Sequence, residues 1–224
     1  MKSLLSILLL FLFVTNTHTQ STCSTYYPFE EGSSFQITNY NKKGKKETVV
    51  NYNITNVTET SAMFNTQILD KKGKEITTSN YDIICENDLV SIDFKSMMSP
   101  DLFSQYKNID MDFEGTNIEL PNNLSVGQTL KDAEMKMTMN MSGIKMNLGI
   151  NIINRKVEAQ ESITTPAGTF DCYVITYDTE MKMGLKRIGK NKEWIAKGVG
   201  LVKSENYNKK GKLISYSELT QISN

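Results

Sequence analysis

The chain has 224 residues, in which 25 lysine and arginine residues balance 25 aspartate and glutamate residues. Its lysines are spread over many turns rather than gathered in a stripe, so the composition does not match a nucleic-acid-binding protein. The only histidine, His18, lies close to the N-terminus. Activation of serine or cysteine by histidine, and zinc sites built on imidazole, are therefore excluded from the rest of the chain.

The N-terminus has the pattern of a secretory signal peptide. Lys2 is followed by the apolar run LLSILLLFLFV at 4–14, which is shorter than the roughly 20 residues of a membrane-spanning helix. A basic start, a short apolar core and a polar end are typical of a cleaved signal. We therefore expect residues 1–20 to be a signal peptide and 21–224 to form a single β domain. This domain would be periplasmic or secreted and would have no transmembrane segment.

Three cysteines follow the signal: Cys23, Cys85 and Cys172. Export permits disulfides, and three cysteines allow one pair and one free thiol. Spacing does not choose the pair, and we favour Cys23 with Cys85. Lipid attachment at Cys23 is an alternative, although Gln20 and Thr22 fit a lipoprotein signal poorly.

Three turns share one pattern: NKKGKK at 41–46, DKKGKE at 70–75 and NKKGKL at 208–213. Asn or Asp begins a type I turn, and the glycine takes the left-handed position that other residues avoid, so each turn predicts the tip of a β-hairpin. Lysines at such tips usually keep sheet edges soluble. If the three tips lie at one end of the fold, they would also suit peripheral contact with an anionic membrane or glycan.

The segments between the turns favour strands. β-branched and aromatic residues alternate with polar ones in runs at 46–57, 61–69, 77–85, 89–94, 170–178 and 193–207. One short helix is expected near residues 99 to 107, where Ser99 would be the cap and Pro100 the first turn. The stretch DMDFEG at 110–115 begins like a calcium loop, but Pro121 stands where that loop needs glutamate. A strand with one charged face is the better interpretation.

The segment MKMTMNM at 135–141 places a methionine at every second residue. With Ser142-Gly143 as a turn, it would form a hairpin with 144–152, which has one apolar and one polar face. Methionine pairs could bind copper, but no histidine accompanies them, so core packing or the flexible wall of a ligand groove is favoured. The predicted ligand-binding residues are Met135, Met137, Met139, Met141, Ile144, Met146, Leu148 and Ile150.

No catalytic residues are predicted. The chain has no phosphate-binding glycine loop, no nucleophile elbow and no dinucleotide fingerprint. Carboxylate pairs such as Asp178 with Glu180 occur on alternating strands, where most charges are solvated. We therefore expect a protein without enzymatic activity and without a metal or other cofactor.

Three stretches resemble a known family: YYPFEEGSSFQITNYNKKGK from Tyr26, ITTPAGTFDCYVITYD at 163–178 and EWIAKGVGLVKSENYNKKGKL at 193–213. The chain resembles the TapB-like family of exported proteins from Gram-negative bacteria, which is related to a domain of unknown function. The resemblance implies a periplasmic or surface location and an open half-barrel like that of lipoprotein carriers, whose concave face holds acyl chains. It supplies no catalytic residues.

The sequence thus predicts an all-β protein with a single curved antiparallel sheet of about ten strands, as a half-open barrel or a sandwich, and one short helix. The function expected is binding of a hydrophobic ligand, a lipid or an apolar peptide, on the Met/Ile-rich face. The alternative is a structural or assembly component of the cell envelope with a closed core. Its partners would be that ligand or an envelope protein, and not nucleic acid.

Overall fold

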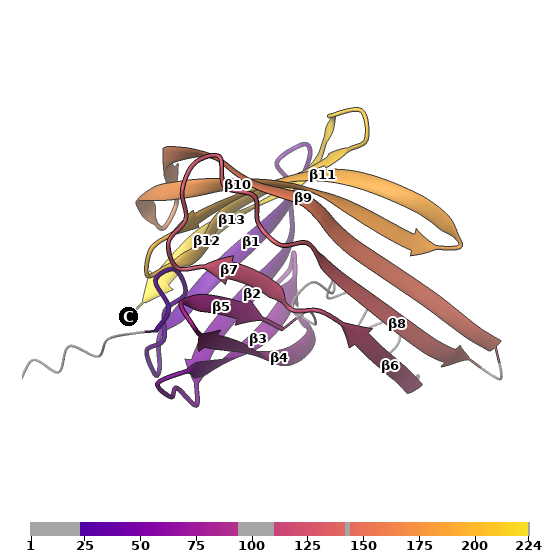
Figure 1. The fold of residues 1–224 in the computed structure, drawn as a ribbon, viewed down its shortest axis with the longest axis horizontal. Coiled ribbons are helices and arrows are strands. Elements are labelled where there is room, and N and C mark those ends of the chain that lie inside the picture. Colours follow the sequence, from indigo (N-terminus) through magenta and orange to yellow (C-terminus); the bar gives the residue numbers. More distant parts are fainter. Residues whose placement is uncertain (1–22, 94–109, 142–143, 224) are drawn as a thin grey trace, which may run out of the picture.

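The computed structural model describes residues 23–93, 110–141 and 144–223, which form one antiparallel sheet of 13 strands (Figure 1). The strands are β1 (Ser34–Asn41), β2 (Lys46–Thr55), β3 (Ser61–Asp70), β4 (Glu75–Glu86), β5 (Leu89–Ile92), β6 (Asp110–Gly115), β7 (Ile118–Pro121), β8 (Ala133–Met141), β9 (Ile144–Thr165), β10 (Gly168–Met183), β11 (Leu185–Ala196), β12 (Gly200–Asn208) and β13 (Leu213–Ser223).

The order in the sheet is β6-β8-β9-β10-β11-β12-β13-β1-β2-β3-β4-β5-β7. The edge strands β6 and β7 each pair on one side only, with β8 and β5, so the sheet does not close into a barrel. The expectation of an all-β fold with one curved antiparallel sheet is confirmed, and the sheet is not divided into the two sheets of a sandwich.

No helix occurs among the described residues. The segment near residues 99 to 107, where one short helix was expected, lies outside the described residues. The Ser142-Gly143 turn also lies outside them. The described part of the chain accordingly contains no helix long and apolar enough to cross a membrane.

The three lysine-rich turns are hairpin tips, as predicted. In each of 41–46, 70–75 and 208–213, the side-chain oxygen of the first residue accepts hydrogen bonds from the backbone N–H groups two and four residues later, at 2.8–3.2 Å. The glycine at the fourth position has a φ of +73° to +84°, which favours glycine. The shared sequence therefore produces one shared geometry.

The methionine segment is β8, and it pairs with the start of β9 in the register expected from the alternation. Met135 lies opposite Ile150, Met137 opposite Leu148, Met139 opposite Met146 and Met141 opposite Ile144. The other edge of β8 pairs with β6, so the stretch 110–115 is a strand and not a calcium loop. Met135, Met137 and Met139 are fully buried.

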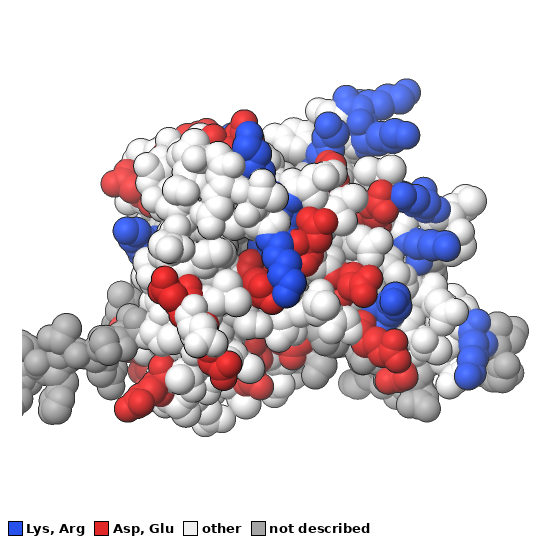
Figure 2. Space-filling view, in the orientation of Figure 1, with Lys and Arg blue, Asp and Glu red and all other residues white. Residues whose placement is uncertain are grey.

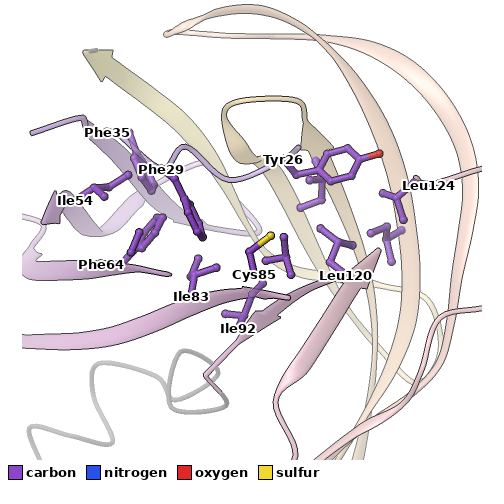
Figure 3. Close-up of a cluster of buried hydrophobic side chains, with 14 of the residues drawn as sticks. Tyr26, Phe29, Phe35, Ile54, Phe64, Ile83, Cys85, Ile92, Leu120 and Leu124 are labelled. Carbon is purple, nitrogen blue, oxygen red and sulfur yellow. The ribbon is translucent and has the colours of Figure 1, made fainter. Parts of the chain in front are cut away.

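The main core lies inside the curl of the sheet (Figure 3). Phe35, Phe64 and Ile83, from β1, β3 and β4, belong to the same buried cluster as Ile175 and Ile195, from β10 and β11. These two groups of strands are far apart in sheet order but face each other across the curl. Burial of apolar side chains from both sides, worth about 1.5–3 kcal/mol for each large one, favours the curved shape over a flat sheet.

The segment before β1 fills one end of this core. Tyr26 and Phe29 are almost fully buried in it, and the Tyr26 ring packs edge-on against Tyr173 with ring centroids 6.0 Å apart. A disulfide joins Cys23 to Cys85 in β4, with a Cα–Cα distance of 5.8 Å. The N-terminal segment is thereby fixed to the sheet.

Candidate functional site

The inner face of the sheet is hollowed into a groove of about 630 Å³. Isoleucines and tyrosines together supply more than half of its lining, among them Ile37, Ile152, Ile175, Tyr52 and Tyr81. Its wall is drawn from strands on both sides of the curl. Ligand pockets are typically apolar hollows of about 300–1,000 Å³ with a few polar groups, and this groove fits that description.

Two paired strands run along the groove. On β11, Arg187, Gly189, Asn191, Glu193 and Ile195 recur at every second residue and all line it. Alternate side chains of a strand share a face, so this column extends about 20 Å from Arg187 to Glu193. Arg187 is exposed and Ile195 is buried, which gives the groove an open end near the β10–β11 connection and a closed end at the core.

The partner strand β10 repeats this gradient. Met181, opposite Arg187, is 38% exposed, whereas Ile175, opposite Glu193, is 2% exposed. Ile214 of β13, which also lines the groove, is 51% exposed. The open end therefore presents apolar side chains to solvent.

A polar cluster lies deep in the groove. The Tyr177 hydroxyl donates a hydrogen bond of 2.6 Å to Oε1 of Glu193. Burial raises the pKa of Glu193, although the Tyr177 hydrogen bond and the nearby Arg155 charge act in the opposite direction. Burial likewise raises the pKa of Tyr177 well above its ordinary value, so its hydroxyl stays protonated and remains a donor.

Arg155 ties together two parts of the curl. It is 4% exposed, and its Nη1 donates to the carbonyl oxygens of Glu119 in β7, at 3.0 Å, and of Lys131. In the sheet, β7 is one edge and β9 is close to the other, so this guanidinium bridges strands that do not pair. Burial lowers the pKa of Arg155, and the negative charge of Glu193 partly offsets this.

The closed end of the groove is aromatic. The Tyr52 ring stacks on Phe35 with centroids 4.4 Å apart, and the Tyr81 ring stacks on Phe64 at 5.7 Å. Burial raises the pKa of Tyr52 to about 12. Flat, rigid rings of this kind provide apolar contact area at little entropic cost to a ligand that reaches them.

The structure places the predicted ligand-binding residues in two environments. Ile150 lines the groove, while Met135, Met137, Met139 and Leu148 are buried and are not among its lining residues. Met146 is partly buried, and the side chains of Met141 and Ile144 are outside the described part of the structure. No contact with a ligand tests these residues, so their role stays a prediction. The groove itself was not located from the sequence.

The described residues include no group of three or more His, Cys, Asp or Glu side chains that could hold a metal ion. Cys172 is a free, buried thiol whose pKa burial raises to about 11, so it is a poor nucleophile near neutral pH. What the groove can do chemically is bind apolar surface and exchange hydrogen bonds with a polar group through Glu193, Tyr177 and Asn191.

The chain is similar to one protein family and to several solved structures. The model of the DUF3108-like family matches residues 30–219. A solved structure from Bacteroides fragilis, assigned as an exported protein with a YmcC-like fold, has a TM-score of 0.74 at 23% identity, covering 90% of this chain and all of that one. A protein from Parabacteroides distasonis assigned as a lipoprotein has a TM-score of 0.76 at 25% identity, covering 89% of this chain and 99% of that one.

No curated protein matches the chain. The two structural neighbours share the fold, and their descriptions as an exported protein and a lipoprotein agree with the signal peptide expected at residues 1–20. The protein is accordingly periplasmic or secreted. The comparisons give the broader family and do not test the TapB-like resemblance.

Proposed function

The chain belongs to the DUF3108-like family, and we propose that it is an exported, non-enzymatic protein that binds a hydrophobic ligand in the groove of its curved sheet. The ligand class is a lipid or an apolar peptide. Membership of the TapB-like family is part of this proposal and rests on likeness of sequence and fold. This resemblance implies an open half-barrel whose concave face binds acyl chains.

The observation that carries the proposal is the groove's composition. Nine isoleucines and five tyrosines line it, and the apolar residues at its open end are among the most exposed of the described chain. Exposing Met181 and Ile214 to water has a free-energy cost that a bound apolar chain would remove, at about 25 cal/mol per Å² covered. The half-buried Glu193–Tyr177 pair would then meet a polar group of the ligand.

The predicted Met/Ile face extends this proposal. Ile150 lines the groove, and its neighbour across the sheet, Met135, is fully buried in β8. Methionine side chains adapt to varied shapes, so a ligand longer than the groove could reach this face by displacing them. We keep these methionines as secondary ligand contacts.

Native mass spectrometry of protein purified from its host tests the proposal first. We expect an additional mass that matches a co-purifying lipid or apolar peptide. A mass for the polypeptide alone, together with failure to bind the apolar dye N-phenylnaphthylamine, would argue for a closed core without a ligand.

Two variants locate the binding site. Met181→Asp and Ile214→Asp place a charge at the open end of the groove and should weaken dye binding about tenfold or more. Ile84→Asp is the matched control, because Ile84 is exposed to nearly the same extent as Met181, 37% against 38%, and lies outside the groove. Equal loss in all three variants would show that the dye binds elsewhere.

The alternative function is that of a structural or assembly component of the envelope. It is favoured by the fully buried side chains of Met135, Met137 and Met139, which suit a closed core as well as a ligand wall. In that case the wild type and the groove variants would bind the dye equally, or none of them would bind it. The native mass would then correspond to the polypeptide alone.

A further inference from the structure

The meander of the sheet brings its lysine-rich turns to one end. Antiparallel neighbours reverse direction at each connection, so the tips of β1–β2, β3–β4, β10–β11 and β12–β13 all lie at the same end of the strands. Lys42 in the first of these donates its backbone N–H to the carbonyl of Ile214 beside the last, at 3.0 Å. Thr48, two residues after the first turn, pairs with Asp70 at the start of turn 70–75, so the three repeated turns lie on neighbouring hairpins.

This end of the sheet is strongly basic. Turn 41–46 carries four lysines, 70–75 and 208–213 carry three each, and 182–187 carries two lysines and Arg187. All of these side chains are exposed, and only turn 70–75 adds carboxylates. Within 182–187, the charge of Lys186 is partly neutralised by Glu180, whose Oε1 lies 2.7 Å from the lysine Nζ. Even so, the charge of this end is clearly positive.

The opposite end of the strands is acidic. Its connections include Glu30, Glu31, Glu59, Glu86 and Asp88, all exposed. Figure 2 shows the separation on one face: Lys and Arg gather towards the right, on the side of the β10–β11 and β12–β13 tips, while Asp and Glu dominate the lower left. A neutral chain has therefore been folded into a molecule with a basic end and an acidic end.

The basic end also carries an exposed apolar side chain. Leu185, which follows Gly184 at the tip between β10 and β11, is 81% exposed, more than any other large hydrophobic residue described. Gly184 has a φ of +74°, the left-handed conformation that lets the chain reverse here. An apolar side chain in water, surrounded by lysines, is the pattern of a protein segment that enters the boundary between lipid headgroups and acyl chains.

We propose that this end of the sheet docks on an anionic lipid membrane, with Leu185 inserted below the headgroups and the lysine-rich turns held against them. Charge complementarity favours this occupant, since each basic residue near an anionic leaflet adds attraction that salt weakens. Docking here places the open end of the groove, at Met181 and Arg187, against the membrane. The inference goes beyond ligand binding and does not require a ligand in the groove.

Co-sedimentation with vesicles tests the proposal. Vesicles of phosphatidylglycerol mixed with phosphatidylcholine should bind the protein, and vesicles of phosphatidylcholine alone should not. Lys209→Gln should weaken binding about fivefold, since a basic residue near the surface is worth about 1 kcal/mol. Lys197→Gln, in the exposed turn at the opposite end, is the matched control and should leave binding unchanged.

The apolar contribution is tested at Leu185. Leu185→Ser should weaken vesicle binding at least about threefold, because it removes the aliphatic side chain that inserts below the headgroups in the docked protein. Val126→Ser is the control, since Val126 is 57% exposed in a different part of the molecule. Neither change should alter dye binding in the groove, so a failure of membrane docking is distinct from a failure of ligand binding.

Three results would overturn the proposal. The first is equal binding to both kinds of vesicle. The second is binding to anionic vesicles that Leu185→Ser and Lys209→Gln affect no more than their controls. The third is binding to the anionic glycan heparin without binding to any vesicle, which would assign the basic end to a glycan instead.

Discussion

Arg155 provides the sharpest test of how the curl is held. Its Nη1 bonds two backbone carbonyls, one of them in the edge strand β7, so Arg155→Met removes a bridge between opposite parts of the sheet. Methionine keeps most of the apolar volume of the side chain and removes only the donors and the charge. The change therefore isolates the polar contribution of the bridge.

The expected loss of stability is about 2–4 kcal/mol. Each hydrogen bond between a charged group and a buried partner contributes roughly 1.5–3 kcal/mol, and two are lost. Part of this is regained, because the buried guanidinium no longer has to be desolvated; that cost is also why burial lowers the pKa of Arg155. Urea unfolding of the wild-type protein and the variant, followed by circular dichroism, measures the difference.

The pH dependence separates the hydrogen bonds from the charge. Burial raises the pKa of Glu193, and Arg155 restrains that rise, so Arg155→Met should raise it further. A carboxyl group with a raised folded pKa stabilises the fold below its unfolded pKa, and this contribution is lost as pH rises through the folded pKa. The stability deficit of the variant should therefore be larger at about pH 8 than at about pH 5.

A double variant completes the test. In Arg155→Met combined with Glu193→Gln, no carboxylate remains to be charged, so the deficit should not change with pH. A loss below about 0.5 kcal/mol for Arg155→Met, the level of an ordinary surface change, would refute the assignment of this arginine as the bridge of the curl. A pH-independent deficit in the single variant would refute its coupling to Glu193.

Three further changes test other parts of the fold. Met139→Lys should cost about 3–5 kcal/mol in urea unfolding, because Met139 is fully buried, whereas Met139→Leu should cost less than about 1.5 kcal/mol. Asp70→Asn should preserve its turn, since Asn41 caps the same geometry in turn 41–46. The backbone hydrogen bond from Lys74 lowers the pKa of Asp70. The wild type should therefore lose the stabilising contribution of this turn as the pH falls through that lowered pKa, whereas the variant should not. Replacing Cys23 and Cys85 with serine should cost about 4 kcal/mol, the chain-entropy value for a disulfide that spans 62 residues, measured by the shift of the urea midpoint.

Local chemistry predicted local structure well. The Asn/Asp-Lys-Lys-Gly turns appear as expected because each contains its own cap and its own left-handed glycine. The register of β8 against β9 follows from the alternation of Met135–Met141 and 144–152, because a shift by one residue would bury the polar face. Both features depend on residues close together in the sequence.

The groove could not be located in this way, because it depends on the curl. Its wall combines Tyr52 and Tyr81, from β2 and β4, with Ile175 and Glu193, from β10 and β11. No periodicity in the sequence predicts that β2 and β4 will face β10 and β11. The sheet curves because both sets of side chains are buried together, and that is a property of the whole chain.

The position of Arg155 shows the same dependence on distant residues. Strict alternation from Ile150 and Ile152 would turn Asn154 towards the groove and Arg155 away from it. Instead Asn154 has a φ of +57°, and Tyr177 lies opposite two residues of β9 between the pairs Asp178 with Ile153 and Thr176 with Lys156. This bulge inserts one residue and inverts the pattern, so that Arg155 and then Val157 face inward.

Asn154 makes such a bulge possible, because asparagine tolerates the left-handed conformation, and its side chain bonds Asp178 at 2.9 Å. The bulge would nevertheless be unfavourable if Arg155 had no acceptors inside. The acceptors are the backbone carbonyls of Glu119 and Lys131. They reach Arg155 because the chain, after the edge strand β7, runs back along β9 before it begins β8. The sequence permits the bulge locally, but the return of the chain from the opposite edge makes it stable.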